Sequence, residues 1–419
     1  MRAKRVRLIL LCVGLAVALV GGGILLSFYR DTALSFFGVT VRVLDLLGIG
    51  LTSAAGVLMT LYRRLRRRMP VRLPAPLVFR VGNWPPPPQV PFILADGIDL
   101  DCPRLLGPDQ ISCSETESNF RLEWELTKQR EAIVEAYSRG ALCHLTDGQI
   151  VRLENFSLLR VPGDEQPHWR LTFSPVSYYD FVCTNLALTG SMRLTELPGD
   201  ALAVLRQFRR EIDASPPDFH AVFSNRKLAN GLTLHLNVID IDHKLLVGRR
   251  PRNLSIFPDK LVTSVTGAVA WADRAGQDLP PDPFIAAVRE AYEETGIELR
   301  RQDIRFYALG MQADQRHPLL LGEANIDARL ADVVRLSKDA WENERFYYLD
   351  LDNLDLCASV LVYGEWLPAS AVAVCLALLV RHGYRKVAEA FDGAQKNLFR
   401  RWLNRGDPRR HRARWHLLA

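Results

Sequence analysis

The feature that most constrains this chain is a run of 22 uncharged residues, from Leu8 to Tyr29, close to its first residue. About 20 apolar residues are enough to cross the hydrocarbon core of a bilayer as a helix. A second apolar stretch follows Arg30 and Asp31 and ends in 17 uncharged residues, from Leu46 to Tyr62. Together the two stretches predict a transmembrane helical hairpin over residues 1–68, with spans at about 8–29 and 44–62.

Basic residues flank this hairpin on both sides. Four Lys or Arg residues precede the first span, and five Arg follow the second within 63–68. Because cytoplasmic flanks collect Lys and Arg, we expect both termini to lie in the cytoplasm. A signal peptide is a competing interpretation of the first stretch. It would have a shorter apolar region followed by a small-residue cleavage site, which this sequence does not clearly contain. One span followed by an interfacial helix is the other alternative, since Arg42 and Asp45 interrupt the second stretch.

The charge of the chain divides into three parts. Residues 1–68 carry +9 and residues 399–419 carry +6, so the total of +6 leaves −9 for residues 69–398. A hydrophobic content of 48% excludes a disordered chain, and a mean hydropathy of −0.01 is too low for a chain made mostly of membrane spans. The seven cysteines form no CxxC pair, which excludes a disulfide framework and a zinc site.

Composition and turn signals divide the remaining chain. Residues 69–91 are proline-rich and predict a stiff linker. Residues 92–225 are predicted to be a middle α+β domain without identifiable chemistry, and residues 226–398 a further domain, which begins with strands at 232–239 and 244–250. In the middle domain we expect helices at 123–138 and 201–212, and strands at 149–153, 169–173 and 181–186.

The strongest signal for chemistry is the run from Arg289 to Ile297, REAYEETGI. It lies in a predicted helix with Asp282 as N-cap, Pro283 in the first turn and Gly296 as the left-handed stop. Three carboxylates share one side of this helix: Glu290, Glu293 and Glu294. The opposite side is apolar: Phe284, Ile285, Val288, Ala291 and Tyr292. Clustered carboxylates repel one another, and a hard divalent cation such as Mg²⁺ relieves that repulsion.

This run resembles the second half of the Nudix box, the signature of hydrolases that cleave nucleoside diphosphates linked to another group. The resemblance covers about residues 230–390 and implies a C-terminal Nudix-like α/β/α sandwich. It also implies that Arg289 and Glu290 are catalytic, and that Mg²⁺, or Mn²⁺, is bound by Glu290, Glu293, Glu294 and the carbonyl of Gly267. In the family, a glutamate from a later loop often serves as base, for which Glu323 is a candidate.

The first half of the box departs from the family pattern. The family has Gly and Glu where this chain has Ala275 and Pro281, while Gly276 and Asp282 lie one residue later. The sequence therefore supports metal binding better than full hydrolytic activity.

The order of two spans, a middle domain and a Nudix-like domain resembles the two-transmembrane Nudix effectors of bacterial CBASS antiphage defence. The resemblance implies activation by a cyclic nucleotide and disruption of the bacterial inner membrane. The partners implied are membrane lipid, a cyclic nucleotide, further copies of the chain and, genetically, a cyclic-nucleotide synthase, with no DNA expected. The alternatives are a membrane-tethered Mg²⁺-dependent pyrophosphohydrolase and a scaffold with an inactive Nudix fold.

Two features follow the box. The apolar stretch 366–380 leaves only about 12–14 residues after Pro368, so a buried helix is favoured over a third span. The tail 399–419 carries seven Arg together with Trp402 and Trp415. Such a tail is suited to anionic lipid headgroups or nucleic acid, of which we favour lipid, or it is merely solvated.

Overall fold

The computed structural model describes residues 92–95, 103–138, 146–160, 167–188, 197–252, 257–334, 343–404 and 416–417. The predicted membrane hairpin and the proline-rich linker lie outside these residues, as do residues 405–415 and 418–419 of the basic tail. Within the described ranges, no helix is both long and apolar enough to cross a bilayer.

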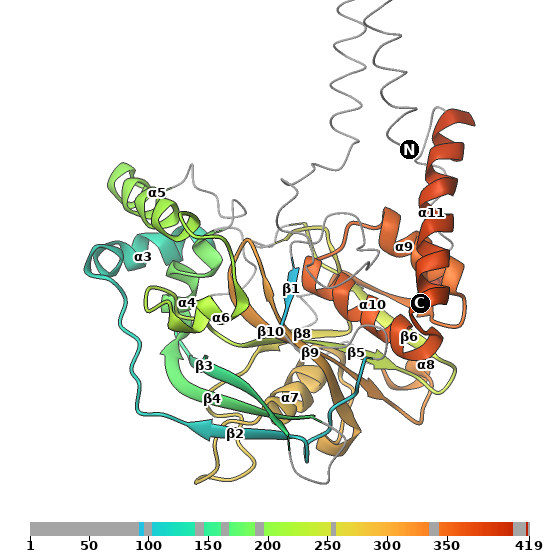
Figure 1. Ribbon diagram of the computed structural model, residues 1–419, viewed down its shortest axis with the longest axis horizontal. Helices are drawn as coiled ribbons and strands as arrows, with labels where there is room; N and C mark the ends of the chain where they lie inside the picture. Colours follow the sequence, from blue (N-terminus) through green and yellow to red (C-terminus); the bar gives the residue numbers. More distant parts are fainter. Residues whose placement is uncertain are drawn as a thin grey trace, which may run out of the picture. The chain divides into compact units, whose positions relative to one another are not determined.

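The larger sheet of the described chain contains nine strands in the order β1-β9-β10-β5-β6-β11-β12, with β8 also on β5 and β7 also on β6. Figure 1 labels β1, β5, β6, β8, β9 and β10 of this sheet. Only the β10–β5 pair is parallel among these neighbours. The bounds are β1 (Phe92–Leu94), β5 (Thr233–Ile239), β6 (Lys244–Arg249), β7 (Leu261–Thr263), β8 (Val265–Ala268), β9 (Ile304–Gln312), β10 (His317–Asn325), β11 (Arg345–Asp350) and β12 (His416–Leu417). The strands predicted at 232–239 and 244–250 are confirmed.

Helices cover both faces of this sheet, which confirms a mixed α+β class. On one face α7 (Pro283–Thr295) packs against β5 residues such as Leu234 and Leu236. On the other face lie α9 (Leu354–Tyr363), α10 (Pro368–His382) and α11 (Tyr384–Asn404). Successive side chains of β5 point to opposite faces of the sheet, so His235 and Asn237 point away from α7 and form hydrogen bonds with α10.

The predicted helix 366–380 is buried. Eleven of the fifteen residues of α10 are buried, and the helix ends at Gly383, which has a φ of 75°. Its burial between the sheet, α9 and α11 explains its uniform apolarity without a third membrane span. The last helix, α11, runs through the predicted boundary at residue 398.

The second sheet has the order β2-β4-β3 and belongs to residues 92–225. Its strands are β2 (Ile111–Glu115), β3 (Gln149–Arg160) and β4 (Pro167–Ser177), and the helices of this region are α3 (Trp124–Ser138), α4 (Tyr178–Cys183), α5 (Gly199–Asp213) and α6 (Phe219–Ser224). The helices expected at 123–138 and 201–212 are confirmed, as are the strands at 149–153 and 169–173. The strand expected at 181–186 is wrong, because the Ser177 hydroxyl accepts from the amides of Tyr179 and Asp180 and starts α4 there.

The regions on either side of residue 225 share one hydrophobic core. Leu171 and Phe173 of β4 belong to the same buried cluster as Leu234 of β5 and Phe284 of α7. In addition, β1 pairs with β9 of the larger sheet. One buried cluster therefore crosses the predicted boundary at 225–226, while another, around α3, α4 and α5, lies almost entirely before it.

This shared core predicts that damage in β4 spreads to α7. Phe173 is fully buried, so Phe173→Ala is expected to cost about 3–5 kcal/mol of unfolding free energy. Hydrogen exchange should accelerate in β5 and α7 as well as in β4. Leu158→Ala, at an exposed position of β3, is the control. Faster exchange confined to residues 92–225 would contradict a shared core.

Candidate functional site

The helix α7 presents the carboxylate cluster, and its ends are those that the sequence predicts. The Asp282 side chain accepts from the Phe284 amide at 2.8 Å, and Gly296 ends the helix with a φ of 70°. The buried side differs from the predicted one, because Tyr292 is 57% exposed while Glu294 is buried. The helix is thus rotated so that Glu294 points toward the sheet.

Arg289 joins this helix to the loop that precedes it. Its Nε and Nη2 donate to the two carboxylate oxygens of buried Asp273 at 2.8 and 2.9 Å. Its Nη1 donates to Glu290 Oε1 and Glu293 Oε2, both at 2.8 Å. Burial acts to lower the pKa of Arg289, but the Asp273 hydrogen bond and the Glu290 charge outweigh it and raise that pKa. The guanidinium therefore remains charged and holds three carboxylates.

Asp273 is a site residue that the sequence did not reveal. The upstream acidic residue of the box was sought near 281 and 282, but Asp282 serves as the helix cap and as the partner of Arg301 Nε at 2.7 Å. Asp273 instead takes the bidentate bond, and its Oδ2 also accepts from the Ala270 amide at 2.7 Å. Asp273 is a single aspartate in a loop, and only its contact with Arg289 in the folded chain identifies it as a site residue.

The remaining cluster residues lie against β8. Glu294 Oε1 accepts from the Thr266 amide at 3.1 Å, and its Oε2 accepts from Asn343 Nδ2 at 3.5 Å. Glu290 lies so close to Gly267 that a Cβ at Gly267 would overlap the Glu290 carboxylate. A side chain at position 267 would therefore displace the Glu290 carboxylate from its place beside β8.

The donor set matches Mg²⁺ in kind, since carboxylate and backbone carbonyl oxygens are the ligands that this ion prefers. Within the described chain, however, no group of three His, Cys, Asp or Glu side chains is arranged to hold a metal ion. Arg289 Nη1 engages both Glu290 and Glu293, while Glu294 is turned toward Thr266. A cation would therefore compete with Arg289 for two of the carboxylates.

Glu323, the candidate base, does not join this cluster. It accepts from the Tyr307 hydroxyl, from Arg381 Nη1 at 2.8 Å and from Asn325 Nδ2 at 2.9 Å. Arg381 belongs to α10, so Glu323 lies on the sheet face opposite α7. Glu323 is part of a buried ionic cluster beneath α10, and the sheet separates it from the Arg289 group.

A pocket of about 270 Å³ opens beside the cluster, and we call it the α7 pocket. One side contains Glu290 of α7 and residues 266–268 of β8. The sheet, its hairpin turn and neighbouring loops supply Thr233, Leu234, His235, Arg250, Phe257, Gln312, Gln315, His317, Leu319 and Leu367, and the helical region before residue 189 supplies Tyr137, Tyr178, Phe181 and Leu186. The predicted middle domain therefore contributes one wall of the site.

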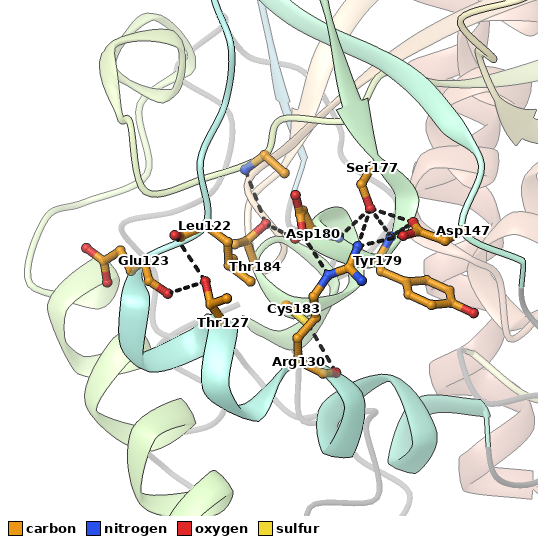
Figure 2. A network of polar contacts seen from close by, with 11 residues as sticks. Leu122, Glu123, Thr127, Arg130, Asp147, Ser177, Tyr179, Asp180, Cys183 and Thr184 are labelled. Carbon is orange, nitrogen blue, oxygen red and sulfur yellow. Dashed lines mark hydrogen bonds and ion pairs between the residues drawn. The ribbon is translucent and has the colours of Figure 1, made fainter.

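The wall from the middle domain is fixed by the polar network in Figure 2. Arg130 of α3 donates from Nε to Asp180 at 2.9 Å and from Nη2 to Asp147 and Ser177, both at 2.7 Å. Burial raises the pKa of the Asp180 carboxyl against the opposing Arg130 bond. Burial acts in the same direction on Asp147, but the hydrogen bonds from Ser177 and Arg130 outweigh it and lower its pKa. The network ties α3 to the start of α4, the helices that supply Tyr137 and Phe181.

Two histidines in the pocket are buried in the neutral form. Burial lowers the pKa of both His235 and His317 to about 3. His235 Nδ1 pairs with the Ser370 hydroxyl at 2.9 Å, and His317 Nε2 pairs with the Thr233 hydroxyl at 3.1 Å. At neutral pH, both rings therefore act as uncharged hydrogen-bonding groups.

No family model and no curated protein matches this chain. Its structural neighbours include a MutT protein from Methanosarcina mazei, at 15% identity over 40% of this chain and 95% of that one, with a TM-score of 0.24. A Nudix hydrolase from Alicyclobacillus acidocaldarius is 15% identical over 38% and 94%, with a TM-score of 0.27. A MutT/Nudix family protein from Enterococcus faecalis is 16% identical over 42% and 74%, with a TM-score of 0.26. Likeness at this level says nothing of activity or ligand.

The Arg289–Asp273 pair predicts a large effect of Asp273→Asn. The substitution leaves a half-buried guanidinium without its bidentate partner, so the unfolding free energy should fall by about 1–3 kcal/mol. Denaturant titration measures this change. Asp278→Asn, at an exposed position of the same loop, is the matched control. An equal effect of the two substitutions would exclude an anchoring role for Asp273.

The buried histidines predict loss of stability in mild acid. Their folded pKa lies below the unfolded value of about 6.5, so the unfolded state binds more protons as the pH falls from 6.5 toward 3. The stabilisation is complete above pH 6.5 and should decrease by on the order of 2 kcal/mol for each histidine between pH 6.5 and pH 5. His317→Gln should remove about half of this pH dependence in thermal unfolding, whereas His220→Gln, on the surface, should preserve it.

Proposed function

We propose that the region after residue 91 binds a nucleotide through a Nudix-type site. One observation carries this proposal: Glu290 and Gly267, the helix and strand parts of the predicted metal site, line the same pocket as Arg250. A phosphate chain needs positive charge, and a carboxylate cluster provides it only through a cation. The pocket thus combines the place for a cation with a cationic side chain.

In this site Mg²⁺, or Mn²⁺, would be held by Glu290, Glu293, Glu294 and the Gly267 carbonyl, and would neutralise phosphate charge. Arg289 restrains Glu290 and Glu293 through its Nη1, and Asp273 fixes the guanidinium from the other side. Gly267 leaves the space that the Glu290 carboxylate needs beside β8. Arg250 provides a fixed positive charge that does not depend on the ion.

We further propose that this binding serves a membrane-anchored effector of a CBASS-type antiphage system. A cyclic nucleotide would bind the cytosolic region, and the hairpin of residues 1–68 would then act on the bacterial inner membrane, with both termini cytoplasmic and several copies assembled. Two features support binding over cleavage. Pro281 replaces the upstream glutamate of the box, and the candidate base Glu323 lies on the opposite sheet face.

The second candidate is a membrane-tethered, Mg²⁺-dependent pyrophosphohydrolase for a nucleoside diphosphate derivative. It is favoured by the contacts of Arg289 with Glu290 and Glu293 at 2.8 Å, which resemble the arrangement that the Nudix motif implies for catalysis. Under this candidate the hairpin is only an anchor.

Dye-filled liposomes carrying the full chain separate the two candidates. The effector proposal predicts that at least one cyclic nucleotide of a panel releases dye, without Mg²⁺-dependent release of phosphate-containing products. Substitutions in the hairpin should abolish this release. Leakage that stays unchanged across the panel would exclude the effector.

The hydrolase predicts product formation instead, lost by at least about a hundredfold in Glu290→Gln because a ligand of the ion is removed. Glu298→Gln, at an exposed position just after α7, is the control and should retain activity. Removal of residues 1–68 should leave the hydrolase rate unchanged, whereas it should abolish dye release by the effector.

A further inference from the structure

The α7 pocket contains polar groups that the fold leaves without hydrogen-bond partners. Within the described chain, Gln312 Oε1, Gln315 Nε2, His317 Nδ1 and Arg250 Nε are buried and have none. The first three side chains are only 1%, 1% and 5% exposed. Buried polar groups in folded proteins are nearly always paired, so four exceptions in one pocket need an explanation.

The chemistry of these groups indicates what pairs with them. Gln312 offers its unpaired oxygen as an acceptor, and Gln315 offers its unpaired nitrogen as a donor. His317 Nδ1 is a donor or an acceptor according to the tautomer of the neutral ring, whose Nε2 is already paired with Thr233. A ligand that satisfies them must itself present donors beside acceptors along an edge. The hydrogen-bonding edges of nucleobases have this pattern, and glutamine is a familiar partner of such edges.

Aromatic residues provide the surface that a flat ring needs. Tyr137, Tyr178 and Phe181 line the pocket from α3 and α4, and Phe257 lines it from the loop before β7. Phe181 meets the His317 ring edge-on, with centroids 5.4 Å apart. Stacking on aromatic side chains contributes to the binding of bases of every type.

The polar edge is held in place by the region before residue 189. Asn185 donates from Nδ2 to the carbonyls of Gln315 at 3.3 Å and Arg316 at 3.0 Å, in the turn between β9 and β10. Its Oδ1 accepts from the Asn230 amide at 2.8 Å. The same region carries the network of Figure 2, which fixes α4. The aromatic wall and the polar edge are thus fixed relative to each other.

We propose that the part of the α7 pocket around Gln312, Gln315 and His317 is a nucleobase subsite, walled by α3 and α4. The inference rests on the proposed function, in which the same pocket binds a nucleotide beside Glu290. The volume of about 270 Å³ suits one base with its sugar and not a whole oligonucleotide. The region of residues 92–225 thereby acquires a role, since its aromatic wall stacks on the base while the polar groups of Gln312, Gln315 and His317 recognise its edge.

Binding measurements on the full chain in nanodiscs with Mg²⁺ test this subsite. The probes are ATP, GTP, CTP, UTP, cyclic di-AMP and cyclic di-GMP, together with tripolyphosphate, which has phosphates and no base. At least one base-containing probe should bind more than about tenfold tighter than tripolyphosphate. Gln315→Met and Gln312→Met should each weaken the binding of that probe by about 10- to 100-fold and leave the binding of tripolyphosphate unchanged.

Gln302→Met, at an exposed position before β9, is the matched control and should bind as the unmodified chain does. If Gln315→Met fails to fold, Gln315→Glu tests the same point, because it keeps the size of the side chain and removes the amide donor. Tripolyphosphate binding that equals nucleotide binding, with both insensitive to the glutamine substitutions, overturns the subsite and leaves the phosphate site standing. If neither tripolyphosphate nor any nucleotide binds, the proposed function fails and the subsite fails with it.

Discussion

The candidate site depends on one ion pair, the bidentate bond between Arg289 and buried Asp273. This bond holds α7 against the loop that leads from β8, and it directs the remaining nitrogen of Arg289 toward Glu290 and Glu293. A charged group is stabilised in a partly buried position only when its partners are fixed. Because the guanidinium is fixed, the carboxylates of α7 can lie side by side in the folded chain without a bound ion. The approach of Glu290 to Gly267 then follows from where the helix is anchored.

The parts of the site that could be predicted are those specified by neighbouring residues. The cap at Asp282, the stop at Gly296 and the shared side of Glu290 and Glu293 follow from local helix geometry, and the structure contains all of them. The rotation of α7 that buries Glu294 depends on packing against β8, and the contact of Asp273 with Arg289 joins positions 16 residues apart through a loop. Neither carries a local signal.

The same distinction explains the largest errors of the sequence interpretation. The segment 181–186 has the residue types of a strand, but the cap at Ser177 and the packing of Phe181 start a helix before it. The shared core across residue 225 joins Phe173 to Phe284, more than a hundred positions apart. The α7 pocket is the extreme case, because its walls come from α3, α4, β5, β9 and α7, and no two of its polar residues form a motif.

The assembly of the pocket has a consequence for how a ligand acts. A nucleotide whose phosphates lie at Glu290 and whose base lies at Gln315 contacts both sequence regions at once. The Glu290 end is connected through Arg289 to Asp273, and the Gln315 end is connected through Asn185 to the helices before residue 189. Binding free energy gained only when both ends are engaged couples the two ends of the pocket, and such coupling is reciprocal. Such coupling would serve the proposed effector, which has to respond to its ligand, more directly than it would serve a tethered hydrolase.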